Sequence, residues 1–296
     1  MLPRLHDGVG AAFSGARRGP SLKEPGPFAC VLFTCVFGGW GLERTRDRGG
    51  YPWEVRMEGA FETLILIGRP AAGKSEVIDY LKKTGEADRR RRFHIGPFVE
   101  VDDFPFVWET FEIDDILSRM GRPRCFTTPD YYFVGSHVWD FLIERLNLEF
   151  RKRIARDPAF TRQQTAIVEF SRGGENGFGE AFSILADEIL SRAGIVYISV
   201  SYEESCRKNR RRFRPEQADS ILYHSLPDEK MEFYYRVNDW EKLSGGEKSG
   251  RIRVRGYDVP FAVFDNEPEK TDDATKLGPA LEAVFGRLWG LMTPRS

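Results

Sequence analysis

Short apolar runs alternate with longer amphipathic stretches from residue 57 towards the C-terminus. Unbroken runs of this kind, rich in β-branched residues, are typical of strands that are covered on both faces of a sheet. The runs predict strands at Thr63–Ile67, Phe98–Val101, Thr165–Phe170, Ile195–Ser201 and Val259–Phe264. Helical spacing predicts helices at Ser136–Ala155, Gly179–Ala193, Glu203–Arg212 and Ala274–Leu291, and one more in which Val77, Ile78 and Leu81 face inward.

The alternation of strands and helices predicts an α/β fold, a three-layer sandwich with a parallel sheet of about five strands and right-handed crossovers. The interval between Asp103 and Ala166 is too long for a single crossover connection. We therefore expect a helical insertion after the second strand, over residues 104–160.

The first 56 residues differ from the rest in composition. They hold ten of the 29 glycines and five of the 17 prolines, and they show neither helical nor strand periodicity. Met57 then opens a segment that is typical of the start of a domain. We predict that residues 1–56 are a disordered extension, or a translated upstream region foreign to the functional protein, and that residues 57–296 form the functional domain. A basic arm for a polyanion is the functional alternative.

Composition excludes several classes of protein. With 44 Lys+Arg against 45 Asp+Glu, the net charge of -1 gives no reason to expect a nucleic-acid coat or a membrane-surface protein. The longest apolar run, Phe28–Phe37, is too short to span a bilayer. The four cysteines form no Cys-x-x-Cys pair, so we expect no structural zinc site, and a reducing, cytoplasmic location is the simpler interpretation.

The strongest chemical signal follows the first predicted strand. Gly68, Gly73, Lys74 and Ser75 match the Gly-x-x-x-x-Gly-Lys-Ser pattern of a phosphate-binding loop, between an apolar strand and an amphipathic helix. The glycines let successive backbone N–H groups point at a phosphate, and the helix N-terminus adds partial positive charge. In this chemistry the lysine reaches the β- and γ-phosphates, and the serine hydroxyl ligates magnesium. We predict that ATP with Mg²⁺ binds the loop formed by Gly68, Arg69, Pro70, Ala71, Ala72, Gly73, Lys74 and Ser75.

With this loop, residues 60–290 resemble the P-loop kinases of the adenylate-kinase-like and deoxynucleoside-kinase-like group of small-molecule phosphotransferases. The resemblance implies a magnesium-dependent enzyme that moves the γ-phosphoryl of ATP to a hydroxyl or phosphate of a small acceptor, with nucleoside- or nucleotide-like acceptors favoured. Three further sequence features support this resemblance, and each is less specific than the phosphate-binding loop.

The first feature is the acidic pair Asp102 and Asp103, just past the second predicted strand. A carboxylate at the C-terminal end of a strand lies beside the phosphate loop in an open α/β sheet. In the resembled kinases, an acid at this place commonly holds the acceptor hydroxyl or acts as its base. We assign this role to one of the two without choosing between them; a solvated turn or a helix N-cap is the structural alternative.

The second feature is Glu169, near the end of the third predicted strand, which continues as Phe-Ser-Arg. The pattern is similar to a Walker B strand, whose carboxylate orients magnesium or accepts a proton. It also looks like the Glu-Arg-Ser element of deoxynucleoside kinases, with the order changed. We predict that Glu169 and Ser75 position the metal, and we leave the role of Arg172 open.

The third feature is a basic run after the fourth predicted strand. Arg207, Arg210, Arg211 and Arg214 share one helical face by their spacing, which suits several phosphate oxygens. The resemblance implies a lid region over residues 203–240 whose arginines close over the transferring phosphoryl, with Arg207 and Arg211 as our catalytic candidates. A solvated basic helix or an RNA contact is the alternative.

Two weaker signals concern the ligands. Asp265 and Asn266 follow the fifth predicted strand, where the resembled group often cradles the adenine base, although a helix-initiating turn explains them equally well. The aromatic-rich residues 104–150 lie where that group holds its acceptor, although aromatic residues at this spacing are more typical of a core.

The leading hypothesis is therefore a kinase. Its predicted catalytic residues are Lys74, Asp102, Asp103, Glu169, Arg207 and Arg211. The alternative is an NTP-hydrolysing switch or regulatory ATPase that acts through a protein partner. A polynucleotide-end kinase is disfavoured by the near-neutral charge, so a nucleic-acid partner is not expected. The identity of the acceptor is left open, as is the choice between a monomer and a homodimer.

Overall fold

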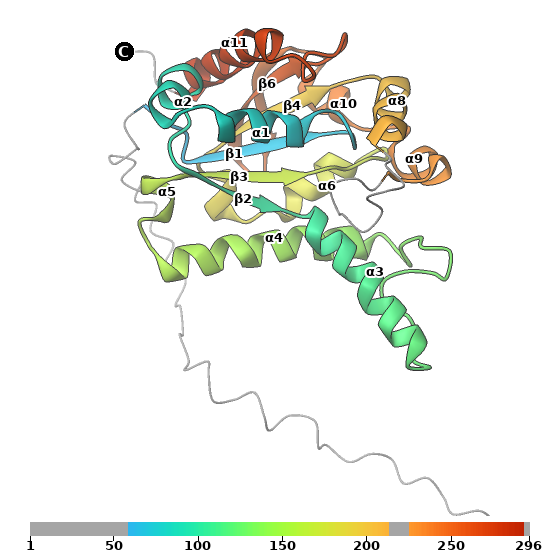
Figure 1. Ribbon diagram of the computed structural model, residues 1–296. Coiled ribbons are helices and arrows are strands. Elements are labelled where there is room, and N and C mark those ends of the chain that lie inside the picture. The colour runs from blue at the N-terminus through green and yellow to red at the C-terminus, as the bar shows by residue number, and fades with distance from the viewer. Residues whose placement is uncertain (1–58, 213–224, 293–296) are drawn as a thin grey trace, which may run out of the picture. The chain divides into compact units, whose positions relative to one another are not determined.

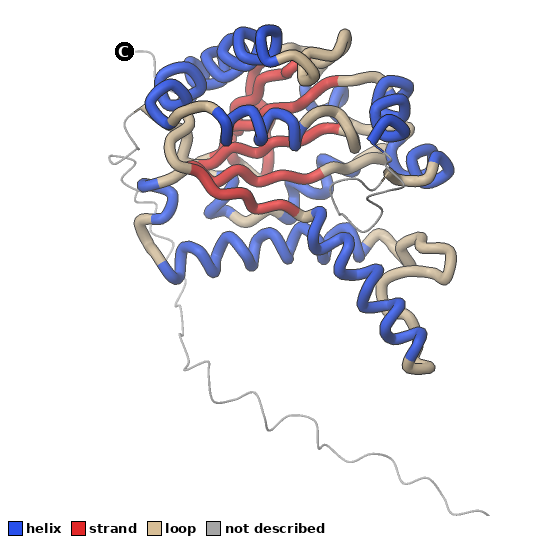
Figure 2. The backbone as a smooth tube through the Cα atoms, in the orientation of Figure 1, coloured by secondary structure: helices blue, strands red, loops and turns tan. Residues whose placement is uncertain are grey.

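The computed structural model describes residues 59–212 and 225–292. The predictions for residues 1–56 and for Arg214 lie outside the described residues. Within them, helices cover both faces of one central sheet, as Figures 1 and 2 show. The α/β class and the three-layer arrangement are confirmed.

Six strands form the sheet, in the order β2-β3-β1-β4-β6-β5. They are β1 (Thr63–Gly68), β2 (Phe98–Asp102), β3 (Thr165–Phe170), β4 (Ala193–Ser199), β5 (Ser249–Val254) and β6 (Tyr257–Asp265). All neighbours pair in parallel except β5, which runs antiparallel to β6. The five predicted strands are confirmed, and β5 is a sixth strand that was not predicted. Its exposed arginines alternate with buried Ile252 and Val254, as expected of a strand at a sheet edge.

The helices are α1 (Lys74–Lys83), α2 (Glu86–Phe93), α3 (Phe104–Arg119), α4 (His137–Arg156), α5 (Phe160–Gln163), α6 (Gly177–Ile184), α7 (Asp187–Leu190), α8 (Tyr202–Arg212), α9 (Asp228–Tyr235), α10 (Trp240–Ser244) and α11 (Ala274–Met292). In Figure 1, α1, α2 and α11 lie on one side of the sheet, and α4 and α6 lie on the other. α3 extends away from the sheet. No helix in the described ranges is both long and apolar enough to cross a bilayer.

Two apolar clusters hold the layers together, and β1 contributes to both. Leu64 and Leu66 pack into the cluster beneath α1 and α11, whereas Ile65 and Ile67 pack into the cluster beneath α4 and α6. Successive side chains of a strand point to opposite faces, so a strand buried on both sides must be apolar throughout. This burial fixes the position of the loop that follows β1.

The predicted helix at Gly179–Ala193 is wrong as a single element. The chain forms α6 and α7 instead, with extended backbone at Leu185 and Ala186 between them. Asn147 on α4 stabilises this break: its amide donates to the carbonyl of Ile184 at 2.9 Å and accepts from the amide of Ala186 at 2.8 Å. A polar side chain from a distant helix thus supplies the hydrogen bonds that continued helix would have made. The local periodicity could not reveal that partner.

The two helical features predicted around the sheet are present. α3 and α4 lie between β2 and β3, and the basic helix α8 follows β4. The carboxyl ends of β1, β2, β3 and β4 therefore face the same edge of the sheet as α8, which is where an open α/β sheet binds its ligands.

Candidate functional site

The loop that is predicted to bind phosphate (residues 68–75, the phosphate loop) connects β1 to α1, and α1 begins at Lys74. Gly73 has a φ of 119°, in the left-handed region that favours glycine. A Cβ atom at this position would lie 2.8 Å from the side-chain nitrogen of Asn266 and 2.9 Å from the methyl carbon of Thr271. Both the backbone conformation and the packing therefore require a glycine here.

Three side chains from elsewhere in the fold donate to carbonyls of this loop, and one side chain of the loop donates to a carbonyl outside it. The carbonyl of Ala72 accepts hydrogen bonds from Asn266 Nδ2 at 2.8 Å and from Lys208 Nζ at 3.5 Å. The hydroxyl of Ser205 donates to the carbonyl of Pro70 at 2.6 Å. On the other side, the guanidinium of Arg69 donates to the carbonyl of Tyr235 at 2.6 Å. The loop is thus held in one conformation by α8, α9 and the segment after β6.

Lys74 lies at the centre of the site. Its side chain is buried, and its Nζ donates to the hydroxyl of Ser171 at 2.6 Å and lies 3.9 Å from Glu169 Oε1. Burial lowers the pKa of Lys74, and the neighbouring carboxylate of Glu169 opposes that shift. The lysine therefore points from the loop towards the end of β3.

Asp102, Asp103 and Glu169 gather at that end. Asp102 and Glu169 are partners in the register of β2 and β3, and the amide of Asp103 donates to the carbonyl of Glu169 at 3.2 Å. Burial raises the pKa of Asp102 to about 8, and the charges of Glu169 and Asp103 add to the shift. Burial likewise raises the pKa of Glu169 to about 7, against the opposing charge of Lys74. The carboxyls of Asp102 and Glu169 are therefore partly protonated near neutral pH, whereas exposed carboxyls are ionised there.

Asp103 forms a buried ion pair with Arg172. The Nη1 of Arg172 donates to Asp103 Oδ2 at 2.5 Å and to the carbonyl of Ser171 at 2.7 Å. The guanidinium lies over two aromatic rings, with its central carbon 4.9 Å from the ring centre of Trp139 and 5.4 Å from that of Phe170. Arg172, whose role the sequence left open, therefore joins the acid cluster to the aromatic residues of α4.

Four basic residues of α8 form ion pairs with one of two acids, Glu269 or Glu76. Arg207 and Arg211 are about half exposed and pair with Glu269, at 3.0 Å and 2.7 Å. The predicted lid arginines therefore contact an acid after β6, while Arg212 reaches the start of α1 and donates to both carboxylate oxygens of Glu76, at 2.7 Å and 2.8 Å. Lys208, fully buried, also pairs with Glu269 at 2.9 Å.

The two residues predicted near the adenine lie in different surroundings. Asn266 is completely buried, and its amide bonds both Ala72 and the hydroxyl of Thr271. Asp265 is exposed, and its carboxylate lies 4.0 Å from Lys248. Asn266 therefore stabilises the phosphate loop through the carbonyl of Ala72. Contact with the adenine base stays a prediction for both Asn266 and Asp265.

Sequence reasoning missed several residues of the site. Ser171 and Arg212 lie next to residues that the patterns did single out, but their partners Lys74 and Glu76 are distant in the sequence. Lys208 lies in the basic run that was predicted to be a lid, where only the arginines were singled out, and Glu269 lies in a turn to which no role was assigned. Burial opposes the ionisation of Glu269, but hydrogen bonds from Lys208 and Arg211 outweigh it and lower its pKa to about 2. In the sequence, Glu269 is a single acid after a predicted strand, and nothing there indicates that cations from a distant helix lower its pKa.

Two of the predicted magnesium ligands are oxygen donors. Ser75 is exposed at the start of α1, and Glu169, the partner of Asp102 in the register of β2 and β3, offers hard carboxylate oxygens. The described residues contain no group of three or more metal-ligating side chains. Magnesium in phosphate sites commonly uses one or two carboxylates together with the phosphates and water, so this donor set suits it.

Comparison with known proteins finds similarity only to solved structures. No family model and no curated protein matches the chain. The chain is similar to a shikimate kinase from Acinetobacter baumannii in complex with shikimate (14% identity, covering 64% of this chain and 78% of that chain, TM-score 0.32). It is also similar to a sugar kinase from Janibacter sp. (10% identity, 79% and 99%, TM-score 0.36) and to TT1252 from Thermus thermophilus (11% identity, 79% and 100%, TM-score 0.41). At these identities and scores, the reaction must be inferred from the site itself.

Proposed function

We propose that this protein is a phosphotransferase that moves the γ-phosphoryl of ATP, bound with Mg²⁺, to a hydroxyl or phosphate of a small molecule. One observation carries the proposal. Lys74 of the phosphate loop points at the acid cluster of Asp102, Asp103 and Glu169, 3.9 Å from the nearest carboxylate oxygen. A transferring phosphoryl held by the loop would therefore meet cationic and acidic groups at once, as transfer to a hydroxyl requires.

The phosphate loop and its neighbouring cations would bind the nucleotide. The backbone amides from Gly68 to Ser75 and the Lys74 ammonium would hold the β- and γ-phosphates. Arg212 lies beside the first turn of α1 through its pair with Glu76, so it is the α8 arginine best placed to reach the phosphates. Ser75 and Glu169 would hold magnesium, which when bound neutralises charge on the phosphates.

The acids would prepare the acceptor. Asp103 is engaged by Arg172, whereas Asp102 accepts only a backbone hydrogen bond, from the amide of Phe104 at 3.0 Å, among the contacts of the described residues. The pKa of Asp102, about 8, matches the requirement for a base near neutral pH. We therefore assign the acceptor hydroxyl to Asp102 and the orientation of Arg172 to Asp103.

ADP release by the full chain, with ATP and magnesium, tests the proposal. The panel of acceptors covers nucleosides, nucleotides, sugars and small alcohols, and the Lys74→Ala variant is the control. Stimulation by one class of acceptor, lost in the variant, is the expected result. Slow hydrolysis that is indifferent to every acceptor would instead favour the switch or regulatory ATPase, which acts through a protein partner.

A further inference from the structure

Arg172 is buried but only half satisfied. Its exposed fraction is 3%, and its Nη1 bonds Asp103 and Ser171. Its Nε and Nη2 are also buried, and neither has a hydrogen-bond partner among the described residues. These two nitrogens form one edge of the guanidinium, with two parallel N–H donors in a fixed geometry. A buried donor without a partner is costly, so an unpaired edge of this kind indicates a place for a ligand.

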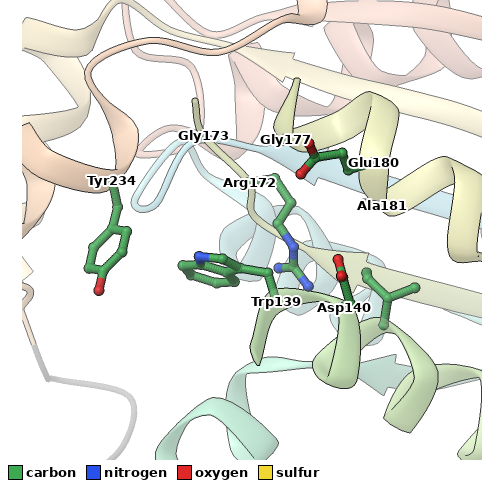
Figure 3. Close-up of a pocket in the computed structure, with 9 residues that line it drawn as sticks. Trp139, Asp140, Arg172, Gly173, Gly177, Glu180, Ala181 and Tyr234 are labelled. Atoms are coloured by element: carbon green, nitrogen blue, oxygen red, sulfur yellow. The ribbon is translucent and has the colours of Figure 1, made fainter. Parts of the chain in front are cut away.

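Arg172 lines a pocket between α4 and α6. Figure 3 shows the guanidinium of Arg172 between the Trp139 ring and the carboxylate of Asp140, with Tyr234 on the far side of the Trp139 ring. Glu180 of α6 also lines the pocket. The ring centres of Trp139 and Tyr234 lie 5.5 Å apart, edge to face. The pocket thus combines an aromatic wall, two donors and two carboxylates.

The charges around the pocket decide which chemistry fits it. Asp103 neutralises Arg172, so Asp140 and Glu180 leave the surroundings with a net negative charge. A carboxylate or phosphate would satisfy Arg172 but would be repelled by the two acids. An ammonium group would satisfy the acids but would face the donors of Arg172. A hydroxyl both donates and accepts, so neighbouring hydroxyls can bond Arg172 and the acids together.

We propose that this pocket binds the hydroxylated part of an uncharged polyol, such as a sugar or cyclitol, whose hydroxyls accept from Arg172 and donate to Asp140 and Glu180. The inference rests on the proposed function, because it names the acceptor of that reaction. Arg172 connects the two places: it lines the pocket, and its Nη1 bonds Asp103 in the acid cluster. A polyol anchored here would be held beside the residues that act on its reacting hydroxyl.

The test measures binding to the full chain by ligand-observed NMR, without nucleotide. Three open-chain probes share their hydroxyls and differ in charge: sorbitol is neutral, gluconate anionic and 1-amino-1-deoxysorbitol cationic, with myo-inositol as a ring probe. The variants are Asp140→Asn, Glu180→Gln and Arg172→Lys. Glu175→Gln, an exposed acid before α6 that does not line the pocket, is the matched control. ATP binding is measured in parallel on every variant.

We expect sorbitol and myo-inositol to bind more tightly than the charged probes. Asp140→Asn and Arg172→Lys should each weaken sorbitol binding by roughly tenfold, the effect of losing a hydrogen bond to a charged group, and Glu175→Gln should leave it unchanged. Should Asp140→Asn fail to fold, Glu180→Gln at its exposed position gives the same comparison.

Two results would overturn the inference and leave the proposed function intact: ATP binds but neither polyol does, or a charged probe binds more tightly than sorbitol. Failure of ATP to bind would instead overturn the proposed function. In that case polyol binding lost in Asp140→Asn would still establish the pocket, but not its role as an acceptor site.

Discussion

The two halves of the site differ in how completely the protein satisfies its own polar groups. On the phosphate side, the carbonyl of Ala72 accepts from two side chains, and Glu269 pairs with Lys208, Arg207 and Arg211. One loop nitrogen, Nε of Arg69, is buried without a partner among the described residues, although Nη1 of the same guanidinium donates to the carbonyl of Tyr235. On the acceptor side, Arg172 keeps one whole edge without a partner among the described residues. The first half is held in place by the protein's own side chains, whereas the second would be completed by the ligand that we propose.

This difference has a functional consequence. A rigid loop suits a ligand common to many enzymes, because preformed donors lose little entropy when the phosphates bind. A pocket with unpaired donors suits discrimination between acceptors, because only a ligand with matching hydrogen-bonding groups removes the free-energy cost of those donors. We expect specificity to be determined on the Arg172 side and the chemical step on the Lys74 side.

The largest effect is expected from Lys74→Ala. Removing the ammonium, which lies 3.9 Å from Glu169, eliminates the cation that we propose contacts the phosphates, so phosphoryl transfer should fall by about 10³-fold or more. Circular dichroism should show an unchanged fold, since the loop is held by Asn266 and Ser205 independently of Lys74. Turnover equal to that of the wild type would contradict the whole assignment of the site.

Arg172→Lys tests the acceptor half by itself. Lysine keeps a positive charge beside Asp103 but cannot offer two parallel donors, so kcat/KM for the acceptor should fall by roughly 10- to 100-fold. The dissociation constant of ATP, measured by calorimetry, should stay the same because Arg172 does not contact the phosphate loop. An equal loss in ATP affinity would show that the two halves are not separate.

Asn266→Ala tests the support of the phosphate half. The variant loses the 2.8 Å hydrogen bond to the carbonyl of Ala72 and frees space against Gly73. ATP affinity should fall by about tenfold while kcat at saturating ATP changes little, since no group that contacts the acceptor is altered. Asp272→Asn, a change at an exposed acid of the same segment after β6, is the matched control. A similar loss in the control would point to the whole segment after β6 rather than to this hydrogen bond.

The smallest expected effect is a dependence of the melting temperature on pH. The folded-state pKa values of Asp102 and Glu169, about 8 and about 7, lie above their values in an unfolded chain, so the folded state binds more protons between about pH 4 and pH 8. Their contribution to stability is therefore fully present below pH 4 and is lost as the pH rises through 7 and 8. The melting temperature should fall by a few degrees from pH 5.5 to pH 8.5 on this account.

Asp102→Asn should flatten that slope, because an amide does not titrate. Asp88→Asn provides the control: Asp88 is an exposed acid of α2 whose pKa is lowered, chiefly by its hydrogen bond with Arg91, so it lies outside this pH range. A slope that survives in Asp102→Asn and in Glu169→Gln would mean that other groups dominate the pH dependence.

Much of the fold could be predicted because its determinants are local. The run from Leu64 to Ile67 is apolar at every position, which leaves little besides a strand covered on both faces. The edge strand β5 was missed because alternating Arg and Ile residues between glycines are weak as a local signal. The break between α6 and α7 depends on Asn147, about 40 positions earlier in the chain, and no local pattern contains that partner.

The sequence by itself determined the phosphate loop, since the spacing of Gly68, Gly73, Lys74 and Ser75 is a local requirement of backbone geometry. It also identified the acids at the ends of β2 and β3, because a strand end is a local feature. Only the tertiary structure decided that Asp103 pairs with Arg172, that Lys208 is buried beneath the loop, and that Arg212 rather than Arg207 reaches α1. The reason is physical: charge pairing and burial depend on which distant segments meet, and a one-dimensional pattern does not contain those distances.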